Sequence, residues 1–236
     1  MDIITRSTTL HQSPISCDPP HLDVKSNQIL NRFTKTEAFC SFDVETDGDN
    51  PMMYSMRSIG LALYDGRNHS MIDSFYVTIA PQEDHRGVKF TPDPHTMKEF
   101  WDKHPEQWAE VNTNNVSPEK AMSLLAVWFQ LHYQNFSIKF VARPSNFDWM
   151  WLKCYYEKYG PKNKPNIGYF CHDLSSLMRA YQKCHDIRDK KKFITQLSGD
   201  APYTHNALDD AICQGRMYMT LRRLLDCDSN QNQSLT

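Results

Sequence analysis

The order of apolar segments between residues 38 and 225 constrains the fold more than any other feature of this sequence. The first three segments are short and β-prone, and they cover residues 38–44, 57–64 and 70–79. The turn-forming residues Asp65-Gly66-Arg67-Asn68 join the last two as a β-hairpin. Helical segments then alternate with a strand at residues 138–142. This order predicts an α/β domain in which a mixed β-sheet is flanked by α-helices.

Helix-start signals support the same order. Ser117 is a typical N-cap residue. Pro118 suits the first helical position, because the backbone N–H of that position has no partner within the helix. The negative charge of Glu119 is favourable near the positive end of the helix dipole. We expect this helix to run to about His132. The other predicted helices cover residues 95–103, 145–156, 173–181 and 206–225, with one short strand before residue 173.

The two ends of the chain differ from this ordered middle. Residues 1–36 are polar and contain Pro14, Pro19 and Pro20, so we expect a flexible N-terminal extension. The domain itself is expected at residues 37–225, which is long enough to bury a substantial core. Residues 226–236 are again polar, and we expect a flexible C-terminal tail there.

Composition excludes several classes of protein. The 26 Lys and Arg residues nearly balance the 28 Asp and Glu residues, and the net charge of −2 argues against a uniformly basic chromatin-type binder. No apolar run approaches the roughly eighteen residues of a membrane helix, so we expect no membrane partner and no signal peptide. The seven cysteines are an odd number with wide spacing, which predicts a reducing, cytoplasmic compartment. The linear pattern does not specify an oligomeric state.

Two carboxylates lie at the end of the first predicted strand. Asp43 and Glu45 are two residues apart, so both side chains project from the same face of the strand. A third carboxylate, Asp148, lies in the first turn of the helix that follows the strand at residues 138–142. Taken alone, an acid in a first helical turn is more often a favourable partner of the helix dipole.

The third acidic segment begins the last helix. If Asn206 caps this helix, His205 precedes the cap and Asp210 is the fourth helical residue. These two positions are neighbours at a helix entry, so a base would lie beside an acid. The ends of strands and helices are where α/β folds build their sites, and clustered carboxylates destabilise each other's ionised forms. A divalent cation would compensate, and oxygen ligands favour Mg²⁺ or Mn²⁺ over zinc.

Three motifs carry a resemblance to a known family. They are FDVETDG at residues 42–48, SNFDWMWL at residues 145–152 and HNALDDA at residues 205–211. In this order they resemble the motifs of the DEDDh superfamily of 3′-5′ exonucleases, which has a ribonuclease-H-like fold, over residues 38–225. The segment PHTMKEFWDKHPEQW resembles the corresponding segment in the branch of this superfamily that contains phage-type exonuclease A and the mycobacterial exoribonuclease.

The resemblance implies a 3′-5′ exonuclease that releases nucleoside 5′-monophosphates from single-stranded RNA or DNA, with RNA slightly favoured. It implies two divalent cations, Mg²⁺ or Mn²⁺, which stabilise the attacking and leaving oxygens. Asp43 would bridge both ions. Glu45 and Asp210 would hold the ion that carries the attacking water, and Asp148 would support the second ion through water. His205 would take the proton of the water as general base.

Residues beside the motifs are candidates for substrate contact. By similarity to the family, Thr46 is placed to touch the terminal nucleotide. Three aromatic residues would either stack on bases or pack in the core, namely Phe147, Trp149 and Trp101. A basic run would either bind phosphates or form a solvated charged surface, and it comprises Lys190, Lys191 and Lys192.

Two other classes of function are compatible with parts of the pattern. The pairs Cys171-His172 and Cys184-His185 suggest a zinc-stabilised interaction domain, but their spacing differs from that of common structural zinc sites. Adjacent residues in regular structure also point apart. A catalytically inactive nuclease fold could bind nucleic acid without cleaving it, although all five family positions are filled.

Overall fold

The structure is a computed structural model that describes residues 35–199, 201 and 203–233, with side chains as far as Asp228. Its centre is a five-stranded sheet in the order β3-β2-β1-β4-β5. The strands are β1 (Thr36–Thr46), β2 (Met56–Asp65), β3 (Met71–Thr78), β4 (Phe136–Ala142) and β5 (Cys171–Asp173). The first three strands pair antiparallel, whereas β4 is parallel to β1 and β5 is parallel to β4. The predicted mixed sheet is therefore confirmed.

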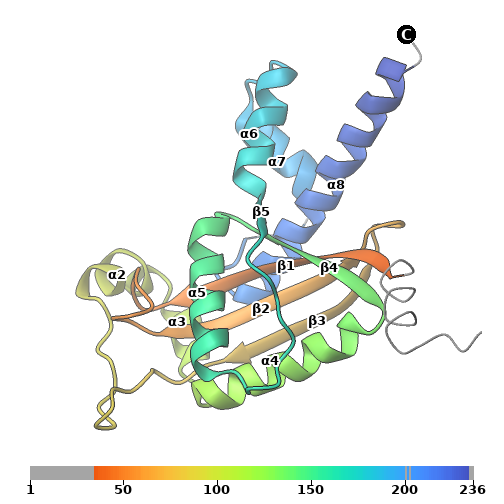
Figure 1. Cartoon of the computed structure of the whole chain (residues 1–236). Coiled ribbons are helices and arrows are strands. Elements are labelled where there is room, and N and C mark those ends of the chain that lie inside the picture. Colours follow the sequence, from red (N-terminus) through yellow and green to blue (C-terminus); the bar gives the residue numbers. More distant parts are fainter. Residues whose placement is uncertain (1–34, 200, 202, 234–236) are drawn as a thin grey trace, which may run out of the picture. The chain divides into compact units, whose positions relative to one another are not determined.

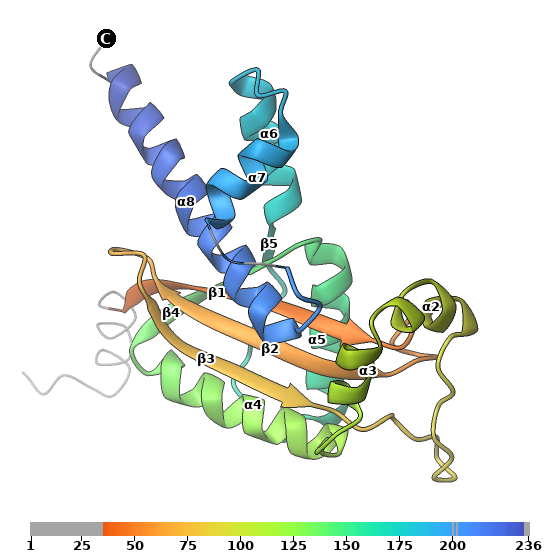
Figure 2. The same cartoon turned by 180° about the vertical axis from the view of Figure 1, so that it is seen from behind.

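Helices cover both faces of this sheet (Figure 1). One face carries α4 (Pro118–Tyr133) and α5 (Ser145–Tyr159). The first half of α8 (Ala207–Gln233) crosses the other face, and its second half runs beyond the sheet beside α6 (Leu174–Cys184) and α7 (Lys190–Ser198) (Figure 2). Where β1 ends lie α2 (Pro94–Glu99), a 3₁₀ turn (Trp101–Lys103) and α3 (Pro105–Val111).

Alternation along β1 divides the domain into two apolar cores. Phe42 and Val44 belong to the core beneath α4 and α5, whereas Phe39 belongs to the core beneath α6, α7 and α8. Because successive residues of a strand face opposite sides, Asp43 and Glu45 project on the α8 side of the sheet. The acids therefore face the element that carries the third acidic segment.

Local sequence signals explain most element boundaries, and Ser117 is an example. Its hydroxyl oxygen accepts a hydrogen bond from the Lys120 backbone N–H at 3.3 Å, and Pro118 occupies the first position of α4, as predicted. The predicted helix at residues 95–103 is wrong in one respect, because it is interrupted at Phe100. The interruption turns Trp101 inward, where it is 1% exposed and donates its indole N–H to the Thr46 carbonyl at 3.0 Å.

Three further helical features differ from expectation. α8 continues to Gln233, past the expected end at Leu225 and into the segment expected as a tail. The added residues after Leu225 are polar apart from Cys227, and there Asp228 pairs with His185 at 3.2 Å. The sequence pattern also gave no indication of α3 or α7, which span only 7 and 9 residues.

A buried ion pair attaches α3 to β2. Arg57 is 1% exposed, and its guanidinium lies 3.4 Å from the carboxylate of Asp47, directly after β1. The same guanidinium donates to the side-chain oxygen of Asn112 at 2.7 Å, just after α3, and lies over the Trp108 ring at 5.1 Å. The aromatic residues of the segment between α2 and α3 are thereby held against the end of β1.

Two of the compositional expectations concern the described part of the chain. No helix in it combines the length and the apolar character that crossing a membrane requires. The six cysteines that it contains are all free. The expected extension at residues 1–36 lies almost entirely outside the described residues.

Gly60 allows α8 to approach the sheet closely. A Cβ atom at this position would lie 2.3 Å from the backbone carbon and oxygen of Ala207, the first residue of α8. We predict that Gly60→Ala displaces the start of α8 and lowers the free energy of unfolding by about 1–3 kcal/mol, as overpacking does. Urea denaturation measures this change.

The control for this variant is Gly168→Asn. An added Cβ at Gly168 meets no atom within 4 Å, and asparagine tolerates the positive φ of 72° found there. A loss of stability in Gly168→Asn as large as that in Gly60→Ala would contradict the role assigned to the close approach.

Candidate active site

β1 presents the first two acids toward α8. Asp43 and Glu45 lie opposite Gly60 and Ser58 in the register of β1 with β2. The side-chain Nε2 of Gln214 on α8 donates a hydrogen bond to Oδ1 of Asp43 at 2.7 Å. Glu45 is buried. Asp43 and Glu45 therefore lie on one face of the strand, as their spacing predicted.

Asp148 reaches the same region from the first turn of α5. It is 3% exposed, and its Oδ2 has no hydrogen-bond partner among the described residues. Burial raises the pKa of Asp148 to about 8, and hydrogen bonds from the backbone N–H groups of Arg143 and Val44 oppose this shift only in part. The carboxyl group is therefore held in surroundings that favour its protonated form or a bound cation.

The start of α8 supplies the remaining residues. The side-chain oxygen of Asn206 accepts hydrogen bonds from the N–H groups of Leu208 at 2.9 Å and Asp209 at 3.3 Å, which confirms it as the N-cap. His205 precedes the cap with a φ of 59°, an uncommon conformation for a residue with a side chain. Asp210 is the fourth residue of α8, and its Oδ1 accepts the Thr204 N–H at 2.9 Å.

These elements bring the four carboxylates and the histidine together. One ligand atom each from Glu45, His205 and Asp210 can be chosen so that all lie within 4.8 Å of one another. The pKa of Asp43 is raised well above its ordinary value, first by burial and then by the charges of Asp148, Glu45 and Asp210. Burial also raises the pKa of Asp210 to about 6. The residues from three distant motifs therefore form one cluster, which we call the acidic cluster: Asp43, Glu45, Asp148, His205 and Asp210.

Aromatic residues border His205, and the sequence motifs did not identify them. The ring of His104 lies 4.1 Å from the ring of His205, measured between centroids, and the ring of Phe100 lies 5.0 Å away at an angle of 89°. Burial and the neighbouring charges of His205 and Lys103 lower the pKa of His104. Gln214 was also missed, although its spacing of four residues from Asp210 places both on one face of α8.

A cavity of about 300 Å³ opens beside Glu45. It contains two of the four predicted nucleotide-contact residues, Thr46 and Phe147, together with Phe100. Trp101 is buried, so the expectation that it stacks on a base is corrected in favour of core packing. Trp149 packs on Phe140 with ring centroids 5.1 Å apart. The cavity is large enough for a small planar group and lies directly against the acidic cluster.

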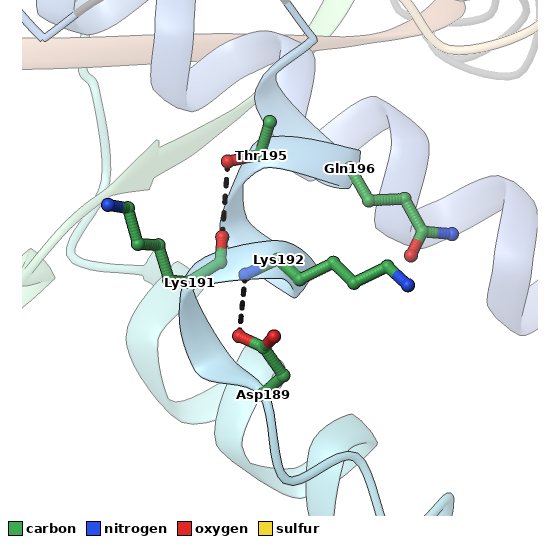
Figure 3. A pocket seen from close by; sticks show the side chains of 5 residues that line it. All are labelled: Asp189, Lys191, Lys192, Thr195 and Gln196. Carbon is green, nitrogen blue, oxygen red and sulfur yellow. Dashed lines mark hydrogen bonds between the residues drawn. The ribbon is translucent and has the colours of Figure 1, made fainter.

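The basic run at residues 190–192 forms the first turn of α7. Lys191 and Lys192 line a shallow surface pocket, and Figure 3 shows their ammonium groups pointing apart. Asp189 caps this turn by accepting a hydrogen bond from the Lys192 backbone N–H at 2.9 Å. Lys190 lines a different cavity, between α6 and α7. The side chains of the run are therefore divided between two cavities.

The cysteine and histidine pairs do not form a zinc site. His172 packs near the ring of Phe39, with centroids 6.4 Å apart, whereas His185 pairs with Asp228. Within residues 35–199, 201 and 203–233, the only group of three or more His, Cys, Asp or Glu side chains close enough to share an ion is Glu45, His205 and Asp210. The structure thus gives no support to the zinc-stabilised interaction domain.

The chemistry of the acidic cluster fits a divalent cation. Its donors are mainly carboxylate oxygens, which hard cations such as Mg²⁺ and Mn²⁺ prefer. The unpartnered Oδ2 of Asp148 is a buried acceptor that a cation or its water would satisfy. Burial, and then the charges of neighbouring acids, raise the pKa values of Asp43 and Glu45, so a bound cation would favour their ionised forms.

Comparison with solved structures identifies the fold. The nuclease domain of 3′hExo, a DEDDh family member bound to rAMP, is 14% identical, with a TM-score of 0.52 over 81% of this chain and 93% of that domain. Pop2p of S. pombe, in a Mg²⁺- and Mn²⁺-bound form, is 15% identical, with a TM-score of 0.53 over 83% of this chain and 86% of that one.

E. coli exonuclease I in complex with a dT13 oligonucleotide is 16% identical, with a TM-score of 0.57 over 80% of this chain. The chain spans only 43% of the length of that exonuclease. These similarities confirm the ribonuclease-H-like fold that the motifs predicted. No curated protein sequence matches this chain significantly.

Residues 38–221 match the family described as the 3′-5′ exoribonuclease Rv2179c-like domain. The match contains all three acidic motifs and most of the chain. The protein therefore belongs to the Rv2179c-like 3′-5′ exoribonuclease domain family.

Proposed function

We propose that this protein is a 3′-5′ exonuclease that uses two divalent cations to release nucleoside 5′-monophosphates from single-stranded nucleic acid. The observation that carries this proposal is the convergence of four carboxylates and a histidine from β1, α5 and α8 in one cluster. The family match supports exonuclease activity. The Mg²⁺- and Mn²⁺-bound form of Pop2p supports these cations.

Each acid has a distinct role in this proposal. Divalent cations, when bound, stabilise the attacking and leaving oxygens of the phosphodiester. Asp43, whose carboxylate faces the charges of the other three acids, would hold both ions. Glu45 and Asp210, which lie beside His205, would hold the ion of the attacking water. Asp148, which keeps an unpartnered oxygen, would support the second ion through water.

His205 is the proposed general base. It lies beside Glu45 and Asp210, where the attacking water would be held. Phe100 and His104 pack against its ring and restrict its orientation. A histidine is suited to proton transfer near neutral pH. In this role His205 takes a proton from the attacking water while the bond between phosphorus and the 3′ oxygen of the remaining strand breaks. That oxygen takes up a proton from solvent, and His205 returns its own proton to solvent.

The terminal nucleotide is proposed to occupy the 300 Å³ cavity beside Glu45. Thr46 and Phe147 contact it there, and the aromatic ring of Phe147 provides a surface on which a base stacks. We favour RNA over DNA because the family is described as an exoribonuclease. A structural neighbour, E. coli exonuclease I, was solved with dT13, so DNA is the alternative substrate.

Hydrolysis of matched 3′-labelled RNA and DNA oligonucleotides, single- and double-stranded, tests this function. We predict release of labelled 5′-mononucleotides that requires Mg²⁺ or Mn²⁺, is fastest on single strands and is abolished by Asp43→Asn. The substitution removes the charge that bridges the two ions. Binding without metal-dependent hydrolysis would instead identify an inactive nuclease fold that only binds nucleic acid.

The role of His205 predicts a specific defect. We expect His205→Ala to lower kcat by about 10²-fold or more, because general-base terms are typically worth about 10²–10⁴. Mn²⁺ affinity, measured by calorimetry, should change little because the carboxylates remain. His85→Ala, which removes an exposed imidazole that does not belong to the acidic cluster, is the control and should leave kcat unchanged. Wild-type turnover in His205→Ala would remove this residue from the mechanism.

The raised pKa of Asp148 predicts that the stability of the cation-free protein depends on pH. The pKa of Asp148 is about 8 in the folded protein and lower when unfolded, so its contribution to stability is complete below the unfolded pKa and is lost as pH rises toward 8. In EDTA, the free energy of unfolding should therefore fall from pH 5 to pH 8 by more than about 1.4 kcal/mol, the value of one pKa unit.

Added Mn²⁺ should stabilise the protein increasingly over the same pH range, because ions bind the ionised carboxylates. Urea denaturation at each pH, with Mn²⁺ or EDTA, measures both effects. Asp148→Asn provides the comparison and should flatten the profile in EDTA. A stabilisation by Mn²⁺ that is equal at pH 5 and pH 8 would argue against binding at these carboxylates.

A further inference from the structure

A cavity lined by cationic side chains lies between α6, α7 and Arg143, two residues before α5. It is a cavity of about 190 Å³, and we call it the α6–α7 pocket. Three cationic side chains line it, namely Arg143, Arg179 and Lys190. Ser175, Arg179 and Gln182 follow one another at helical spacing on one face of α6. Met178 and Ile194 complete its lining.

The charges of this pocket are not balanced by acids. No carboxylate lines it, and none of its three cations forms an ion pair with another described residue. The nearby acids have other partners: Asp186 pairs with Arg188 at 3.1 Å, and Asp189 caps α7.

One polar group of the pocket also lacks a partner. The side-chain Nε2 of Gln182 is buried and donates to no acceptor in the described part of the chain. A buried donor without an acceptor is costly, and a water or an anion bound in the pocket would satisfy it. Together with three cations, this donor favours a ligand that carries negative charge on oxygen atoms.

Arg143 connects this pocket to the acidic cluster. Its backbone N–H hydrogen-bonds the carboxylate of Asp148, while its side chain lines the pocket. The guanidinium donates to the hydroxyl of Tyr203 at 3.0 Å. Burial raises the pKa of that tyrosine to about 12, and the charge of Asp43 makes a smaller contribution in the same direction. The start of α6 is tied to the same region, because Asp173 accepts the Ser145 N–H at 2.8 Å. Arg143 therefore contacts both the α6–α7 pocket and the acidic cluster.

We propose that the α6–α7 pocket binds a backbone phosphate of the nucleic-acid strand, on the Arg143 side of the acidic cluster. This inference rests on the proposed function and adds the path of the strand to it. A phosphodiester carries one negative charge and two free oxygens, which an arginine fork binds well. Arg179 contacts the phosphate directly, and Lys190 contributes charge from the first turn of α7.

Binding of a 5′-fluorescein-labelled decanucleotide in EDTA, followed by anisotropy at several salt concentrations, tests the pocket without cleavage. We expect Arg179→Ala to weaken binding roughly 3- to 10-fold and to flatten the salt slope by about 0.7, the value of one phosphate contact on a single strand. Arg179→Lys should retain the salt slope. Lys162→Ala, an exposed change of equal charge in the loop after α5, should have neither effect.

A second measurement uses substrates of different length with Mg²⁺. Arg179→Ala should raise KM for the decanucleotide but not for a dinucleotide, which has no phosphate beyond the scissile one. Thermal melting verifies that the variant, altered at an exposed position, remains folded. Equal KM changes for both lengths, or unchanged binding and salt slope, would overturn the proposal.

Inorganic phosphate distinguishes a strand site from a site for a free anion. If Arg179→Ala abolishes phosphate binding, measured by calorimetry, but leaves decanucleotide affinity unchanged, the strand proposal is wrong. If the wild-type protein cleaves no substrate but Arg179→Ala still weakens decanucleotide binding, the phosphate site in the pocket is supported and the proposed exonuclease function is wrong. The two proposals are therefore tested separately.

Discussion

Burial of several carboxylates in one place is the constraint on which this structure depends. Burial raises the pKa values of Asp43, Glu45 and Asp148, and the charges of neighbouring acids raise those of Asp43 and Glu45 further. Hydrogen bonds from Gln214 to Asp43 and from backbone N–H groups to Asp148 offset only part of this cost. The remainder calls for positive charge, so the same arrangement that weakens the cation-free fold creates affinity for divalent ions.

α8 turns this constraint into a site. Its N-terminus lies against the sheet at Gly60, where a side chain would collide with Ala207. That close approach places His205 and Asp210 next to Glu45. The break between α2 and the 3₁₀ turn brings Phe100 against His205 from the other direction. Packing of helices on the sheet, and not any single motif, therefore determines the geometry around the proposed base.

In our proposal the acidic cluster separates two surfaces of different character. One is the cavity with Phe147 and Phe100, which suits a base and sugar. The other is the α6–α7 pocket, whose cations suit a phosphate. A strand that enters along α6 and α7 would present its 3′ end to the carboxylates. In this strand direction only one residue of the lysine run would meet a phosphate, because Lys190 lines the α6–α7 pocket whereas Lys191 and Lys192 line another surface pocket.

The sequence by itself determined the mixed sheet, the N-caps at Ser117 and Asn206, and the five residues of the acidic cluster, because alternation, capping and motif spacing are local properties of the chain. Only the tertiary structure decided which aromatic residues pack in the core and which line the cavity: Trp101 is buried, whereas Phe147 borders the cavity. It alone also brought His104 to His205 and Arg143 to Arg179. These contacts join residues from separate elements, and their distances depend on how helices pack on the sheet, which no local pattern encodes.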